Sequence, residues 1–268
     1  MFRLLWHDIK RVLYSPYFWV AVLMFFAFGL LQQFLSVAGS GVFSLPKKNI
    51  KHIGALNRYI LSLSSPGKGT MESAMPVITV LPCAALFLSE YKSRYMRNVL
   101  VRTGKRRYII SKIISAFLMG ASAVLAGEII LIIVCTAIDP HASNAILRAT
   151  EKGSIYGIYS SSVAKYALFE SANLMLFGGV YSCFALGFSA LLNNKYLTLT
   201  TGFLLANIVI QELKKIIIIP YATTCENLLY LDFYHFTYAD VLTQYGCILL
   251  AGICVFVFAV LRRCRSDV

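Results

Sequence analysis

Continuous apolar runs, long enough to cross a lipid bilayer as helices, dominate this chain. They cover residues 17–37, 70–89, 113–138, 171–192, 197–211 and 241–261. A helix rises about 1.5 Å per residue, so roughly 20 residues cross the hydrocarbon core. The strands of a membrane barrel alternate apolar and polar residues instead, and these runs do not. The sequence therefore predicts an all-α integral membrane protein whose single domain, 1–268, contains six transmembrane helices.

The composition argues against a soluble fold. Hydrophobic residues make up 58% of the chain and charged residues only 14%, whereas a soluble domain carries roughly a quarter charged residues. The net charge of +13 raises the question of nucleic-acid binding. The location of the charge answers it, because basic residues gather in the segments that a six-helix topology places on one side of the membrane.

With six spans, both termini lie on the same side as the second and fourth connecting segments. Together these parts hold fifteen of the 25 Lys and Arg residues but only three of the 12 acidic residues. Short loops that are rich in Lys and Arg stay on the cytoplasmic side. We therefore expect a multi-pass protein of the cell membrane with both termini in the cytoplasm. The charge also attracts anionic membrane lipids, and no nucleic-acid partner is expected.

Two segments outside the spans have a distinct character. Residues 1–16 place apolar and basic side chains on opposite helical faces, which predicts an amphipathic helix at the membrane interface. A cytoplasmic extension of the first span is the alternative. The segment 212–240 is unusually apolar and aromatic for an extracytoplasmic loop. We expect it to re-enter the outer leaflet as short helices, and an ordinary loop with interfacial aromatic residues is the alternative.

The chain lacks the sequence motifs of common enzyme and metal sites. Neither 65–70 nor 104–106 fits the Walker A pattern G-x-x-x-x-G-K-[ST], in which backbone amides cradle phosphate. No H-E-x-x-H, G-x-S-x-G or C-x-x-C pattern occurs, and the four His are far apart in the predicted topology. We therefore expect no enzyme activity, and no cofactor or metal, in this chain itself.

The segment 89–112 carries the most information outside the spans. It contains Glu90, eight basic residues and a break at Thr103-Gly104, and it continues directly into the third span. Physically this pattern predicts a helix–turn–helix that lies against the cytoplasmic face of the membrane. Its charge alone is explained equally well by a loop that only fixes the topology.

This segment resembles the first cytoplasmic loop of the ABC-2 type transporter permease family. Members carry an acidic residue after the second span, a helix, a Gly-containing turn, and then Arg, aromatic and Lys residues that lead into the third span. The corresponding residues here are Glu90, Gly104, Arg106 or Arg107, Tyr108 and Lys112. The N-terminal amphipathic helix, the six spans, the short connection 193–196 and the apolar segment 212–240 extend the resemblance over most of the chain.

The resemblance implies the membrane-spanning subunit of an ABC exporter. Such a permease pairs with a second copy, here expected to form a homodimer, and with two cytosolic ATPase subunits that hold ATP and Mg²⁺. Its substrate is expected to be amphipathic: a peptide, a lipid-like molecule or a drug. One alternative is a secondary transporter, although repeats and several intramembrane charges are missing. Another is a membrane sensor or assembly protein that transports nothing.

The resemblance also implies that the loop 89–112 is a coupling helix that docks on the ATPase. The candidate coupling residues are Glu90, Arg94, Arg97, Arg102, Gly104, Lys105, Arg106 and Arg107. We expect the basic side chains to divide between carboxylates of the ATPase and anionic lipid. Glu90 is placed to pair with Arg94 one helical turn later, and such a pair is weak where it is exposed.

Two further features lie within the predicted spans. Glu128 is the only acidic residue deep inside one, where an unpaired charge is costly. It is a candidate gate or substrate contact; a helix–helix hydrogen bond by a protonated carboxyl and a position near the outer interface are the alternatives. Gly179, Cys183 and Gly187 recur every four residues in the fourth span, which predicts close packing against a neighbouring helix.

Overall fold

The computed structural model is a bundle of helices and contains no strand among the residues that it describes. Those residues are 2–38, 54–63, 70–84, 90, 99, 101–140, 162–192, 195–204 and 238–266. The helices are α1 (Phe2–Leu13), α2 (Pro16–Ala38), α3 (Ala55–Leu63), α4 (Thr70–Ala84), α7 (Lys105–Ile138), α9 (Val163–Leu191), α10 (Lys195–Leu204) and α13 (Tyr238–Ser266). Arg94, Arg97 and most of the segment 212–240 lie outside the described residues.

Within the described ranges, four helices are long and apolar enough to cross a membrane, which confirms the prediction of a helical protein of membrane character. Their apolar stretches are Pro16–Gln33, Lys105–Ile138, Val163–Leu191 and Val241–Arg262. They coincide with the first, third, fourth and sixth predicted spans. The second and fifth runs correspond to α4 and α10, whose described helices have 15 and 10 residues. Six spans therefore stay a prediction.

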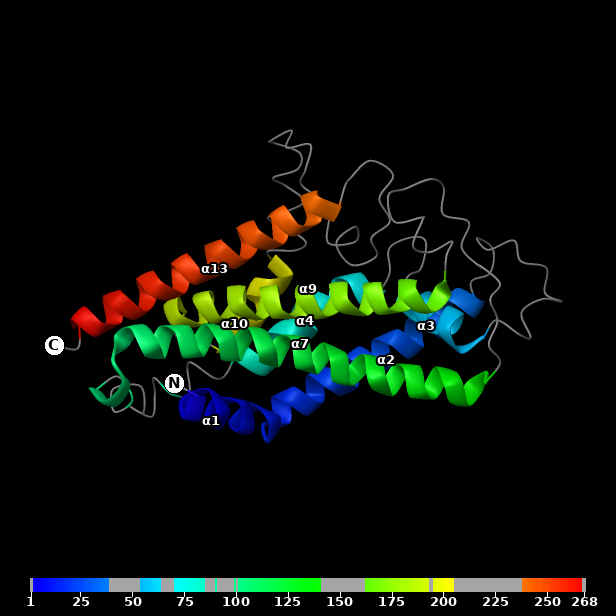
Figure 1. The fold of residues 1–268 in the computed structure, drawn as a ribbon, viewed down its shortest axis with the longest axis horizontal. Coiled ribbons are helices and arrows are strands. Elements are labelled where there is room, and N and C mark those ends of the chain that lie inside the picture. The colour runs from blue at the N-terminus through cyan, green and yellow to red at the C-terminus, as the bar shows by residue number, and fades with distance from the viewer. Residues whose placement is uncertain are drawn as a thin grey trace.

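The long helices α7 and α9 run side by side in opposite directions through the bundle (Figure 1). The helix α13 packs along α9, and α2 packs along α7. Both ends of the chain lie toward the end of the bundle at which α7 begins and α9 ends. This placement agrees with the even number of membrane crossings that the six apolar runs predict.

Two of the helices begin about two turns earlier than their predicted spans. The helix α7 begins at Lys105 rather than at 113, and α9 begins at Val163 rather than at 171. The reason is that hydropathy marks the stretch that sits in lipid, whereas a helix continues through polar residues until something stops it. Gly104 does so before α7, because its φ of +80° is a conformation that other residues rarely adopt.

Small residues bring α9 close to two neighbours rather than to one. Gly179 lies against the ring of Phe117 on α7, and the thiol of Cys183 is 3.5 Å from the carbonyl oxygen of Ile113 on the same helix. Gly187 instead faces α13, where a Cβ atom at this position would lie 2.5 Å from a backbone carbonyl oxygen, that of Gly252. The three residues that share a spacing of four are thus divided between the α7 and α13 interfaces.

Candidate functional site

The corner between α1 and α2 fixes the direction in which α1 leaves the bundle. Pro16 occupies the first position of α2, where no backbone N–H is needed, and the Ser15 hydroxyl accepts a hydrogen bond from the N–H of Tyr17 at 3.3 Å. The indole of Trp19 donates to the carbonyl oxygen of Leu13 at 3.1 Å, which satisfies one of the last carbonyls of α1. These bonds hold α1 against α2.

The side of α1 that faces away from the bundle has interfacial character. Trp6 is 52% exposed, and the Lys10 ammonium lies 5.3 Å from the centre of its ring, a cation–π contact. Tyr14 and Trp19 at the corner are also exposed. Tryptophan and tyrosine favour the headgroup region of a bilayer, so this surface suits a helix that lies at the membrane interface.

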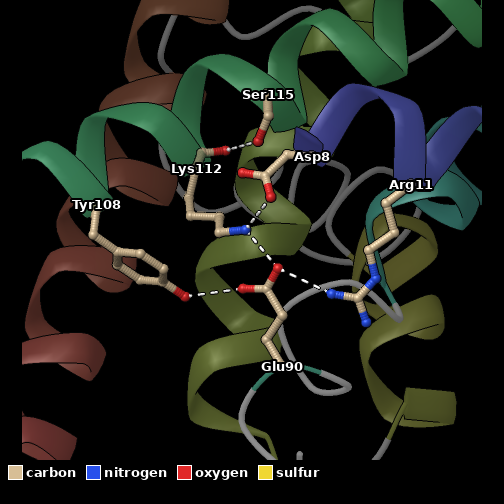
Figure 2. A network of polar contacts seen from close by, with 6 residues as sticks. All are labelled: Asp8, Arg11, Glu90, Tyr108, Lys112 and Ser115. Carbon is tan, nitrogen blue, oxygen red and sulfur yellow. Dashed lines mark hydrogen bonds and ion pairs between the residues drawn. The ribbon is translucent and has the colours of Figure 1, made fainter. Parts of the chain in front are cut away.

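The opposite side of α1 takes part in a network of charged residues around Lys112 of α7 (Figure 2). The Lys112 Nζ is 2.8 Å from Oδ1 of Asp8 and 2.6 Å from Oε1 of Glu90. A guanidinium nitrogen of Arg11 lies 3.3 Å from the same Glu90 oxygen, and the Tyr108 hydroxyl donates to Oε2 of Glu90 at 3.2 Å. We call these five residues the α1–α7 network.

Helical spacing explains how the α1–α7 network assembles. Tyr108 and Lys112 are four residues apart on α7, and Asp8 and Arg11 are three apart on α1, so each pair shares one face of its helix. Both faces contact Glu90, which follows α4 in the sequence. The Lys112 ammonium also lies 5.5 Å from the centre of the Tyr108 ring. The network therefore joins three segments that are distant in sequence.

The α1–α7 network is almost completely removed from solvent. Asp8, Glu90 and Tyr108 are 0% exposed and Lys112 is 1% exposed, whereas the Arg11 side chain is 39% exposed. Burial is the largest influence on the Glu90 carboxyl and raises its pKa, while Lys112 and Arg11 act in the opposite direction. Taking ions out of water is costly, and good geometry with matched charges offsets that cost.

Of the six candidate coupling residues that lie in the described ranges, only Glu90 joins this network. Arg102, Lys105, Arg106 and Arg107 are exposed around the Gly104 break, directly before and within the first turn of α7. The predicted pairing of Glu90 with Arg94 falls outside the described residues, and the bonds described for Glu90 run to Lys112, Arg11 and Tyr108. The four exposed cations can bind carboxylates of a protein or phosphates of lipid.

Sequence reasoning missed Asp8, which it assigned to the polar face of an amphipathic helix. A weak signal was available. Asp8 is the only acidic residue before Glu72, and it lies midway between Leu4 and Val12, which pack into the core on the same helical face. An acid among inward-facing positions needs a cation, and the nearest cation on α7 is found only when the helices pack together.

A second polar contact lies between α7 and α9. Glu128 is fully buried, and its Oε2 accepts a hydrogen bond from the hydroxyl of Ser171; its other carboxyl oxygen has no hydrogen bond within the described part of the chain. This hydrogen bond joins α7 to α9. Because α9 begins early, Glu170 is also buried in a long apolar helix, so Glu128 is not the only such acid. A gating role for Glu128 stays a hypothesis.

Two comparisons of the sequence with known proteins give no match. A scan against protein-family models finds no match to this chain, and a search of curated proteins finds none either. Over the described ranges, no group of three or more His, Cys, Asp and Glu residues is arranged to hold a metal ion. A proposal of function therefore starts from the residues and contacts of this chain.

Proposed function

We propose that this protein is the membrane-spanning permease subunit of an ATP-driven exporter of the ABC-2 type. In this proposal it has six transmembrane helices and cytoplasmic termini, pairs with a second permease copy, and works with two cytosolic ATPase subunits. The observation that supports it most is the α1–α7 network. Glu90, Tyr108 and Lys112, three of the residues on which the resemblance rests, contact one another in its buried centre.

In this proposal, movement at one face of the membrane reaches the other through α7. The exposed cations Arg102, Lys105, Arg106 and Arg107 are adjacent to the α1–α7 network. The network in turn fixes α1 and residue 90 to the beginning of α7. The helix α7 is 34 residues long without a break, about 50 Å at 1.5 Å per residue. A partner that pulls on the cationic end therefore moves α1 and α7 together.

Exposed cations are suited to docking on an acidic surface. Arginine binds carboxylates with two parallel hydrogen bonds, and complementary charge speeds association and fixes its register. Exposed pairs weaken as salt screens them. We expect the ATPase to present carboxylates to Arg106 and Arg107, and the transported molecule to be amphipathic.

The docking proposal is tested by charge reversal away from the buried residues. In the double variant R106E/R107E we expect at least a tenfold loss of permease-dependent ATP hydrolysis and of transport, because like charges then meet at the interface. Expression and helix content should be unchanged, since both side chains are exposed. The control R262E reverses an exposed cation near the C-terminal end of α13 and should retain activity. Normal hydrolysis and transport in the double variant would disprove the docking role.

A secondary transporter is the second candidate, and one observation favours it. Buried acidic residues on neighbouring membrane helices, here Glu128 and Glu170, are typical of proton and cation pathways. This alternative predicts that reconstituted protein moves its substrate without ATP and stops when the ion gradient is collapsed.

A further inference from the structure

An apolar groove opens on the surface of the bundle, at the end that lies away from both termini. It has a volume of about 680 Å³. One wall is the stretch of α2 between Phe26 and Gln33, and the groove is completed by Arg58 of α3 and by Ile138 at the end of α7. Among the described residues that line it, Arg58 is the one charged residue.

With α2 and α7 as membrane-spanning helices, the length of the groove wall matches the depth of one leaflet. Both the apolar stretch of α2, which ends at Gln33, and that of α7, which ends at Ile138, finish beside it. The wall from Phe26 to Gln33 is about 10 Å long at 1.5 Å per residue, and half of a hydrocarbon core is about 15 Å. Its apolar part therefore faces acyl chains, and its polar end is level with headgroups.

At this polar end, the guanidinium group of Arg58 has hydrogen-bond donors that no described residue uses. Its Nε lies 3.3 Å from Oδ2 of Asp139, and the backbone N–H of Gly54 donates to the same oxygen at 3.1 Å. The two terminal guanidinium nitrogens of Arg58 make no hydrogen bond within the described ranges. Asp139 does not line the groove and its side chain is only 4% exposed, so it orients the guanidinium from behind.

We propose that this groove binds one anionic phospholipid, with an acyl chain along α2 and its headgroup phosphate on Arg58. An apolar wall alone would accept the chain of any lipid. A guanidinium with available donors at headgroup level binds the phosphate and favours a headgroup with net negative charge, because the choline cation of a zwitterionic lipid is repelled. The membrane delivers such a molecule laterally. The proposal does not depend on export, because it concerns this chain alone.

The test compares phospholipids on the purified full-length chain in neutral detergent. We add dioleoyl phosphatidylglycerol or dioleoyl phosphatidylcholine and read the apparent affinity from the rise in unfolding temperature and from native mass spectrometry. We expect phosphatidylglycerol to bind at least tenfold more tightly, and R58Q to abolish that preference. A27W, which places an indole in the groove, should weaken binding of both lipids at least tenfold. The control K165Q removes an exposed cation from α9 at the same end of the bundle and should keep the preference.

Several outcomes would overturn the proposal. Equal binding of the two lipids by the unmodified protein would remove selection by charge, and an unchanged preference in R58Q would remove Arg58 from the site. If R58Q does not fold, A27W decides the question, since wild-type affinity in that variant excludes the groove. Glycerol phosphate should cause no shift; if it binds as tightly as phosphatidylglycerol, the site takes a soluble anion and not a lipid.

Discussion

Lys112 is the buried cation that both Asp8 and Glu90 contact, so its loss should destabilise these two acidic residues. In Lys112→Met, Asp8 and Glu90 remain buried, and the cation left beside them among the described residues is Arg11, whose side chain is 39% exposed. Breaking a buried ion pair by removing one partner costs about 3–5 kcal/mol. We predict a loss of that size in the free energy of unfolding, measured by thermal unfolding in detergent. Lys105→Met, which removes an exposed lysine from the same helix, should change it little.

The same network makes a prediction about coupling. If Asp8 and Lys112 interact as the 2.8 Å distance indicates, Asp8→Asn should be less harmful in a Lys112→Met background than in the unmodified protein. Contacting residues show coupling energies of about 0.5–3 kcal/mol in such double-variant cycles. Strict additivity of the two changes in unfolding free energy would mean that the ion pair does not form.

Glu128 allows a test of whether its negative charge is used. Glutamine keeps the carbonyl oxygen that accepts from Ser171 but carries no charge, and an ionised carboxylate is costly at this depth. We predict that Glu128→Gln unfolds at the same temperature as the unmodified protein or higher, whereas Glu128→Leu, which lacks the acceptor, unfolds at a lower one. A marked loss of stability in the glutamine variant would show that the carboxylate is paired with a cation.

At the scale of single residues, the sequence could predict some members of the site but not the residues that they contact. The family pattern pointed to Glu90, Tyr108 and Lys112, yet the expected partner of Glu90 was Arg94, one helical turn away. The described partners include Lys112 and Arg11, which are 22 and 79 positions away in the chain. Helical spacing identifies neighbours within a helix and carries no information on which helices pack together.

At the scale of helices, the contact between α9 and α13 depends on the absence of a side chain at Gly187. A methyl group there would lie 2.5 Å from the carbonyl oxygen of Gly252, so the backbones must separate. We predict that Gly187→Ala lowers the free energy of unfolding by roughly 1–3 kcal/mol, the usual cost of overpacking. Gly246→Ala on α13 is the matched control, because an added methyl group there meets nothing within 4 Å. It should be neutral or slightly stabilising, and an equal loss in both variants would contradict close packing at Gly187.

Hydropathy predicted where the described apolar helices lie better than where they begin. The spans at α2, α7, α9 and α13 coincide with long apolar runs. The early beginning of α9 could not be read from hydropathy, because Glu170 lowers the average over its first turns even though the residue is buried. The burial of Glu170 follows from the packing of α9 against neighbouring helices rather than from the local sequence.

At the scale of the whole molecule, the two features that matter most arise from packing of distant segments. The α1–α7 network needs residues 8, 90 and 112 in one place, and the groove needs α2, α3 and the end of α7. The sequence could predict the asymmetry in charge between the two ends of the bundle. Basic residues such as Arg106 gather at the end with both termini, and this bias reflects charge and topology rather than any particular contact.

The most direct test of the exporter proposal is affinity purification of the tagged full-length chain from native membranes in mild detergent, with mass spectrometry and an ATP-hydrolysis assay on the eluate. We predict a soluble protein with a Walker A motif in near-equal amount, with vanadate-sensitive hydrolysis that is lost in R106E/R107E. A pure, folded permease with no ATPase and no hydrolysis would contradict the proposal. The exposed cations before and within the start of α7 would then be explained by membrane topology alone.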